Sequence, residues 1–159
     1  EDRKGEGLFL IRSAKENLTI SRNDRSFFLN LKKERDLVDE SIRKLQIKVF
    51  SQEQEVGNLS GGNQQKVVIS RWLLEEGDVY IFDEPTKGVD VGAREEIYKL
   101  IEKLAMEQKI VIMVSSNMPE LISMSDRIGV MRDGRLVNIL DSEEATEDML
   151  IKEYIGVKE

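Results

Sequence analysis

The residues whose types and spacing could do chemistry lie in two short stretches near the middle of the chain. One is Ser60-Gly61-Gly62, at the start of a helical pattern, and the other is the acidic pair Asp83-Glu84, at the end of the apolar run 79–82. Glycines carry no side chain, so backbone N–H groups at a helix start can approach an anion directly, and the helix N-terminus adds about half a positive charge. The first stretch therefore suits the binding of phosphate.

The acidic pair suits a complementary role. An acid at the end of a strand can hold Mg²⁺ on nucleotide phosphates, and the next acid can orient or deprotonate an attacking water. Open α/β sheets place their ligands at the carboxyl ends of the strands, where Asp83 and Glu84 stand. Taken alone, Ser-Gly-Gly is better explained by an ordinary capped helix after a turn, and Asp-Glu by a solvated loop start. The two stretches together predict nucleotide chemistry.

A strand–helix–strand pattern must position these residues. Ser60 is a good N-cap, and the helix after it is expected to stop at 75–78. The apolar runs 79–82 and 110–114 read as buried strands of a parallel sheet joined by a right-handed crossover. The helix between them, expected over 92–108, carries an apolar stripe that should cover one side of the sheet, made of Ile97, Leu100, Ile101, Leu104 and Ala105.

The flanking segments have weaker sequence patterns that still predict secondary structure. Residues 1–25 are irregular except for a capped helical start at 13–18, and 26–56 reads as helix from the spacing of Phe27, Phe28, Leu31, Val38, Ile42, Leu45 and Val49. Asp133-Gly134 predicts a two-residue hairpin between strands 127–131 and 135–139. Residues 141–144 are expected to cap a final helix that contains Met149, Leu150, Tyr154 and Ile155.

Composition narrows the available chemistry. The 159 residues are 40% hydrophobic and 35% charged, as in a soluble globular protein. The chain has no cysteine and no histidine, which excludes disulfides, thiol catalysis and cysteine-based zinc sites and leaves carboxylates and backbone groups for chemistry. The net charge of −7 disfavours a nucleic-acid surface or anionic lipid. The basic cluster at 32–35 is better explained as a solvated helix face than as a phosphate track.

In order and separation, Leu59–Lys66 and Asp83–Asp90 resemble the signature motif, Walker B motif and D-loop of the ATP-binding cassette (ABC) family. Asn63–Lys66 and Gly88–Ala93 look most like the second nucleotide-binding domain of tandem ATPases from monosaccharide importers of the ribose/galactose/xylose type. The resemblance takes in residues 1–8 and 115–120 as well. It implies an α/β fold, a partial P-loop NTPase domain with a mostly parallel sheet flanked by helices, plus an α-helical subdomain.

The resemblance also implies a division of the chain. Residues 1–12 would be a loop and strand following a missing Walker A/Q-loop part, 13–57 the α-helical subdomain, 58–140 the ATPase core and 141–159 a C-terminal helix. In the family, the signature loop of one domain closes on ATP held by the Walker A loop of another. The residues that would contact ATP are Ser60, Gly61, Gly62, Asn63, Gln64, Asp90 and Ser116, with Asp83 holding Mg²⁺ and Glu84 acting as the catalytic carboxylate.

Two departures from the family pattern bear on activity. The Walker A pattern Gly-x-x-x-x-Gly-Lys-Ser/Thr is absent from the sequence, so this chain alone is expected to be inactive. Ser116 stands where the family usually has a switch histidine, and a hydroxyl cannot replace an imidazolium. The same Ser115-Ser116-Asn117 run is explained equally well as a simple strand-to-helix turn with Ser and Asn as caps. We expect one competent and one impaired ATP site.

The resemblance implies part of the ATP-hydrolysing subunit that powers uptake of a simple sugar, the sugar itself being chosen by other components. Its implied partners are a second nucleotide-binding domain, integral-membrane permease subunits and, indirectly, a sugar-binding protein, with no nucleic acid. The expected location is cytoplasmic, peripheral on the inner face of the cell membrane, since the acidic start lacks signal-peptide features. Two alternatives stay open: a truncated, non-hydrolytic interaction module, and a non-transport ABC ATPase.

Overall fold

The computed structural model describes residues 7–21 and 31–156. Contacts divide the chain into two compact units: the first contains Glu1–Tyr80 and Pro85–Val111, and the second contains Ile81–Glu84 and Ile112–Glu159. Each unit is described here by itself. Among the described residues, no helix has the length and apolar character needed to cross a membrane.

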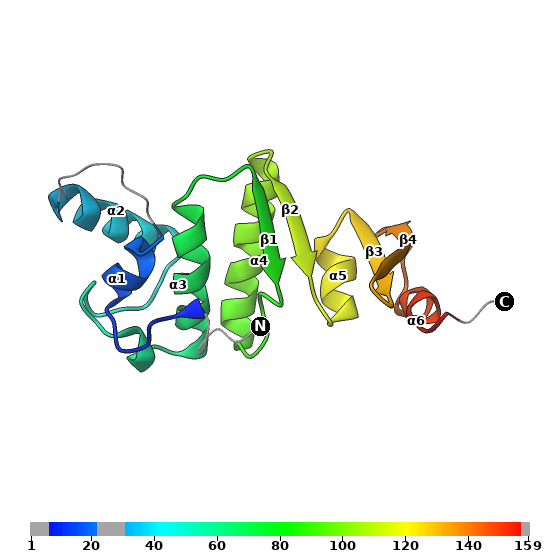
Figure 1. The fold of residues 1–159 in the computed structure, drawn as a ribbon, viewed down its shortest axis with the longest axis horizontal. Coiled ribbons are helices and arrows are strands. Elements are labelled where there is room, and N and C mark those ends of the chain that lie inside the picture. Colours follow the sequence, from blue (N-terminus) through cyan, green and yellow to red (C-terminus); the bar gives the residue numbers. More distant parts are fainter. Residues whose placement is uncertain (1–6, 22–30, 157–159) are drawn as a thin grey trace. The chain divides into compact units, whose positions relative to one another are not determined.

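The elements follow one another in an order that mixes helices and strands (Figure 1). They are α1 (Ala14–Thr19), α2 (Leu31–Lys44), the short 3₁₀ turn η2 (Val56–Asn58), α3 (Gly61–Leu73), β1 (Val79–Asp83), α4 (Val91–Met106), β2 (Ile110–Val114), α5 (Met118–Met124), β3 (Arg127–Arg132), β4 (Arg135–Asp141) and α6 (Glu147–Ile155). The α/β class predicted from the sequence is confirmed.

The core of the first unit lies among α1, α2, η2 and α3. Leu18, Val38, Val56 and Val67 are fully buried there, one from each of these elements. Removing such side chains from water supplies the main driving force for packing the helices together. The predicted helical start at 13–18 is confirmed, because Ser13 caps α1 and forms a reciprocal capping box with Glu16. The backbone N–H of Ser13 donates to the Glu16 carboxylate and lowers the pKa of that carboxyl.

A buried polar group ties α1 to α3. Asn17 is fully buried, and its Nδ2 donates to the carbonyls of Phe9, Arg12 and Ser13 at 2.9, 3.3 and 3.0 Å. Arg71 of α3, itself 7% exposed, donates from Nε to the Asn17 carbonyl at 2.7 Å and from Nη2 to Asn17 Oδ1 at 3.2 Å. Burial lowers the pKa of Arg71. The two side chains therefore satisfy each other in the interior.

The helix predicted over 26–56 is wrong at its C-terminal end. Phe27 and Phe28 lie outside the described residues, and α2 ends at Lys44. Gln46 adopts a left-handed backbone with φ of 49°, its N–H donates to the Arg43 carbonyl at 3.2 Å, and the Ile47 N–H donates to the Ile42 carbonyl at 2.9 Å. This is a Schellman cap, which turns the chain out of the helix. Because such caps usually contain glycine, the glutamine gave no sequence signal.

Helices α3 and α4 begin close to where the sequence places them. The Ser60 side chain accepts from the Asn63 N–H, as predicted, and Asp90 Oδ1 accepts from the Ala93 N–H at 2.9 Å. Figure 1 shows the two helices side by side. The stripe predicted along α4 is confirmed at Ile97, Ile101 and Leu104, which are buried, whereas Ala105 is exposed and does not belong to the covered face.

Strands β1 and β2 pair with each other in a two-stranded sheet. The Ile110 N–H donates to the Asp78 carbonyl at 2.9 Å near the strand starts, and the Glu84 N–H donates to the Val114 carbonyl at 2.8 Å near their ends, so the strands run parallel. Lys109 Nζ lies 2.9 Å from Asp78 Oδ1; this hydrogen bond lowers the pKa of Asp78 and raises that of Lys109.

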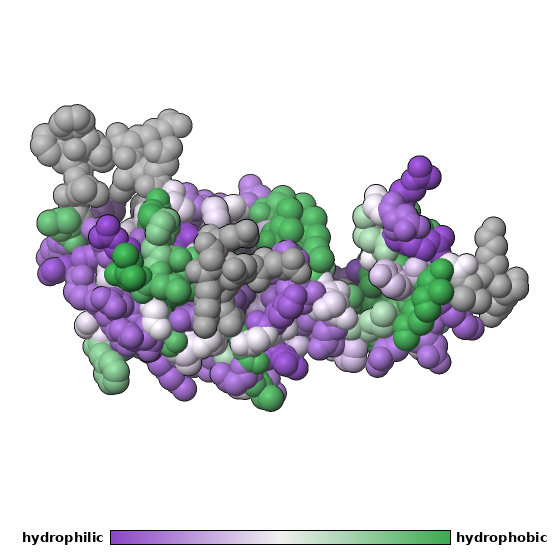
Figure 2. Space-filling model, turned by 60° about the horizontal axis from the view of Figure 1, so that its bottom comes forward, coloured by the Kyte–Doolittle hydropathy of each residue, from purple (hydrophilic) through white to green (hydrophobic). Residues whose placement is uncertain are grey.

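The burial predicted for both faces of these strands is only half right. Tyr80 is buried, but its neighbours Val79 and Ile81 are 51% and 68% exposed, and Ile112 on β2 is 48% exposed. Successive side chains alternate between the two faces of a strand, so one face is covered and the other is open in the structure. Figure 2 shows hydrophobic areas between hydrophilic ones on the visible surface.

The second unit contains the predicted hairpin. Strands β3 and β4 pair antiparallel, with Arg132 opposite Arg135 across Asp133-Gly134. Both turn residues have positive φ, 50° and 73°, as a type I′ turn requires. The final helix is also confirmed, but Thr146 caps it instead of residues 141–144, because its hydroxyl accepts from the Met149 N–H at 3.3 Å. Residues 142–144 form a turn before this cap.

Replacing Asn17 by alanine should destabilise the protein by about 2–4 kcal/mol, because the guanidinium of Arg71 would stay buried with fewer acceptors. Urea unfolding followed by circular dichroism measures this as a lower midpoint. Asn58→Ala is the matched control, since Asn58 is exposed. Equal midpoints for the two variants would show that the Asn17 network contributes nothing.

Candidate functional site

The start of α3 forms one part of the candidate site. Ser60 is exposed and precedes a first turn whose amides point out of the helix end. A Cβ atom on Gly62 would lie 2.4 Å from Ala93 Cβ and 3.3 Å from Asp90 Oδ2. Glycine at this position is therefore required by the packing of α3 on α4. The same contact brings Asp90, predicted to belong to the site, beside the loop of Ser60 and Gly62.

Asn63 and Gln64 take different positions, although the sequence places both in the same motif. Asn63 is half-buried, and its Nδ2 donates to Ser60 Oγ at 2.9 Å while its Oδ1 accepts from the Lys48 N–H at 2.8 Å. Gln64 is 3% exposed, and its Nε2 donates to the Val56 carbonyl at 3.1 Å. Asn63 therefore borders the exposed loop, whereas Gln64 supports it from the interior.

The carboxyl end of β1, in the second unit, forms another part. Asp83 is exposed and Glu84 is half-buried. Glu84 has a left-handed backbone with φ of 48°, a conformation that costs energy for a residue with a side chain. Its Oε1 accepts from the backbone N–H of Ser116 at 2.8 Å. The structure thus joins Glu84 to Ser116 directly, through the serine's main chain.

The loop after β2 is the strand-to-helix turn that the sequence also suggested, and the buried Glu120 that completes it was not foreseen. Ser115 Oγ donates to Oε2 of the buried Glu120 at 2.5 Å and accepts from the Asn117 N–H at 3.0 Å. Asn117 then caps α5, because its Oδ1 accepts from the Glu120 N–H at 3.2 Å. The sequence offered one signal for this arrangement: Asn117 three residues before an acid at a helix start, the spacing of a capping box. This network holds the Ser116 amide where Glu84 meets it.

Comparison with known proteins connects these observations to a family. The family model described as "ABC transporter" matches residues 6–87, which contain the α3 start and the end of β1. The chain belongs to the ABC transporter family. The matched range also contains Leu59–Lys66, where the sequence resembles the family's signature motif.

Curated relatives of this ABC transporter chain are named as sugar import ATP-binding proteins. It is 48% identical to a galactose/methyl galactoside import ATP-binding protein of Clostridium tetani, over 96% of this chain and 31% of that protein. It is 46% identical to a ribose import ATP-binding protein of Caldanaerobacter subterraneus, over 98% and 32%. It is 49% identical to an arabinose import ATP-binding protein of Burkholderia ambifaria, over 96% and 30%. The chain thus spans about a third of the length of these relatives.

Solved structures show the same fold. An ATP-binding cassette in a dimeric, post-hydrolysis state bound to ADP and Pi matches with a TM-score of 0.72 at 22% identity, over 85% of this chain and 59% of that one. The dimeric structure of a bacterial ABC transporter cassette matches with a TM-score of 0.70 at 23% identity, over the same shares. The chain therefore has an ABC ATPase fold in part.

Replacing Gly62 by alanine should destabilise the protein by about 1–3 kcal/mol, because the new methyl group would overlap Ala93. Gly92→Ala is the control: its Cβ would meet Asp90 Oδ1 at an ordinary 3.5 Å, and alanine favours the helix. Urea unfolding measures both. The double variant Gly62→Ala/Ala93→Gly should cost less than the sum of its single changes. Strict additivity would contradict the contact.

Proposed function

We propose that this chain is part of the ATP-hydrolysing subunit of an importer for a simple sugar. The observation that carries the proposal is the 46–49% identity to galactose, ribose and arabinose import ATP-binding proteins over nearly the whole chain. Similar identity to proteins named for three different sugars supports the activity they share, ATP-driven uptake of a monosaccharide. The particular sugar would be selected by components that contact it.

In this proposal, the start of α3 completes an ATP site whose Walker A loop belongs to a second nucleotide-binding domain. Ser60, Gly61 and Gly62 would present backbone amides and a hydroxyl to the γ-phosphate, and Asn63 would border it. Support comes from the exposure of Ser60 and from the position of Asp90 beside Gly62. Gln64 is buried, so its contribution would be to hold the loop against Val56.

The end of β1 would contribute to a second ATP site, the one that belongs to the same nucleotide-binding domain as this chain. No group of three His, Cys, Asp or Glu side chains that could hold a metal occurs in the part of the chain that the structure describes. Mg²⁺ in nucleotide sites takes one or two carboxylates together with phosphate oxygens and waters, and the exposed Asp83 fits that donor set. Bound Mg²⁺ would neutralise charge on the phosphates of ATP. Glu84 would orient the attacking water.

We propose that this second site is impaired. Ser116 meets Glu84 through its backbone N–H, so its side chain is left to contact phosphate with a single neutral hydroxyl donor. A histidine at this position would add a charged donor, which makes a stronger hydrogen bond to phosphate than a neutral one. The two ATP sites of the proposed assembly would then differ in turnover.

The proposed partners follow from the proposed role as part of a sugar-import ATPase. They are a second nucleotide-binding domain, integral-membrane permease subunits and, indirectly, a sugar-binding protein, with the chain held on the inner face of the cell membrane. The dimeric state of the matched cassettes supports pairing of two such domains. The non-hydrolytic interaction module remains the second candidate for the isolated chain, since its 159 residues contain no Walker A pattern.

In the assembled ATPase, Ser60→Arg should lower turnover by about 100-fold, because a bulky cation would block closure on the γ-phosphate, equivalent to about 3 kcal/mol of barrier. Glu84→Gln should cost about tenfold or less, since it affects the site already impaired. Phosphate release at saturating Mg-ATP measures both. Ser51→Arg, at another exposed serine, is the control. Complete and equal losses in Ser60→Arg and Glu84→Gln would contradict the asymmetry.

Calorimetric titration of this chain alone with Mg-ATP should give no binding heat, because most contacts to the β- and γ-phosphates come from a Walker A loop. The control is the same titration on the assembled ATPase, where binding is expected. Tight binding to the isolated chain would mean that it contains another phosphate loop, and the two-domain account of the site would be wrong.

A further inference from the structure

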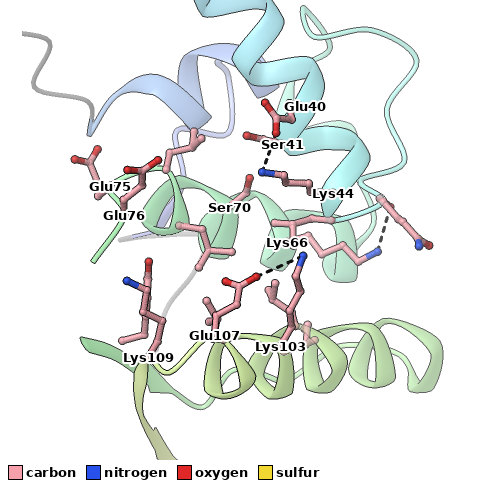
Figure 3. A pocket seen from close by; sticks show the side chains of 18 of the residues that line it. Glu40, Ser41, Lys44, Lys66, Ser70, Glu75, Glu76, Lys103, Glu107 and Lys109 are labelled. Atoms are coloured by element: carbon pink, nitrogen blue, oxygen red, sulfur yellow. Dashed lines mark hydrogen bonds and ion pairs between the residues drawn. The ribbon is translucent and has the colours of Figure 1, made fainter. Parts of the chain in front are cut away.

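Neither the sequence motif nor the family comparison gives a role to Lys66. It lies on α3 one turn after Gly62, and its side chain is 5% exposed. Its ammonium group forms an ion pair with Glu96 of α4 and donates to the Gln46 carbonyl at 3.1 Å. Figure 3 shows Lys66 extending from α3 toward the end of α2. One charged group thus joins α3, α4 and the turn that follows α2.

Neighbouring lysines make a useful contrast. Lys66 lines a groove of about 960 Å³ between α2, α3 and α4 together with Lys44 and Lys103. Lys44 pairs with Glu40 on its own helix and Lys103 with Glu107 at the end of its own helix, each four residues away and each well exposed. Such pairs contribute little and hold no elements together. Lys66 differs because it is buried and its partners belong to two other segments.

Burying the Lys66 ammonium costs desolvation that offsets its attraction to the partly exposed Glu96, so the pair adds little net stability but does restrict geometry. Gly62 and Lys66 are one turn apart on α3, and their contacts Ala93 and Glu96 are about one turn apart on α4. Two contacts along the same pair of helices restrict the sliding of one helix on the other. The third contact, to Gln46, holds the end of α2 to the same point.

We propose that Lys66 is a positioning residue of the nucleotide site, which keeps the Ser60 loop at the start of α3 in fixed register with the Asp90 loop at the start of α4. It acts through Glu96 and the Gln46 carbonyl, without contacting nucleotide. The nucleotide part of this inference rests on the proposed function, whereas the coupling of the two helix starts does not.

Hydrogen exchange on this chain tests the coupling. The reporting amides are those of Gln64 and Arg94, which donate to the carbonyls of the two caps, Ser60 and Asp90. Lys66→Met, of similar length without charge, should raise exchange at both amides together by about tenfold, while the Leu150 amide in α6 stays unchanged. Lys66→Arg keeps the charge and should restore the original rates.

Two results would overturn the coupling. Lys66 would be an ordinary stabilising residue if exchange rose equally at the Asn17 amide of α1, and it would not join the helix starts if only one of the two reporting amides changed. Glu96→Gln is the second variant should Lys66→Met fail to fold, because Glu96 is 36% exposed and its loss is milder. The same paired rise at Gln64 and Arg94 is expected from it.

Kinetics of the assembled ATPase test the nucleotide part. Lys66→Met should lower kcat by about tenfold and change the KM for ATP by about twofold or less, since the Walker A loop binds ATP and the α3 start acts when the site closes. Lys66→Arg should stay within about twofold of the parent in both constants. A raised KM with unchanged kcat would contradict positioning. Unchanged turnover in Ser60→Arg would contradict the proposed function. The hydrogen-exchange result would still show whether Lys66 couples the starts of α3 and α4.

Discussion

The close approach of α3 and α4 at Gly62 and Ala93 is the constraint on which the first unit depends. Only a residue without a side chain allows the two helix starts to touch, because a methyl group at Gly62 would overlap Ala93. Each helix start is capped by its own side chain, Ser60 on α3 and Asp90 on α4. The contact therefore places the capped starts of the two helices next to each other.

The first half of the chain holds α3 in place through contacts from α1 and from the turn after α2. Arg71, near the C-terminal end of α3, is anchored by Asn17 of α1, and Lys66, in its first half, is anchored by the turn that ends α2. Both anchors use buried cations paired with backbone carbonyls, which is a directional contact as well as a stabilising one. The apolar side chains of Leu18, Val38 and Val67 supply the burial, and these polar contacts select one orientation of α3.

Local chemistry explains why much of the fold was predictable. Ser13, Ser60 and Asp133-Gly134 act through hydrogen bonds and backbone angles within a few residues, so their types alone indicate helix starts and a turn. The misses have a common cause. Gln46 and Glu84 take left-handed conformations that their residue types do not favour, and only surrounding contacts hold them there. The openness of one face of β1 likewise depends on what packs against it, which periodicity does not report.

The candidate site divides in the same way. The sequence by itself determined the family and pointed to the residues of the candidate site, because Ser60, Gly61, Gly62, Asp83 and Glu84 lie in short motifs whose order carries the information. Only the tertiary structure decided that Gly62 faces Ala93, that Gln64 is buried against Val56, and that Lys66 joins α3 to α4 and to the turn after α2. The contacts of Gly62 and Lys66 join segments 20 or more residues apart, and that of Gln64 joins α3 to the turn before it. Their geometry follows from how whole helices pack, and no local pattern of residues encodes it.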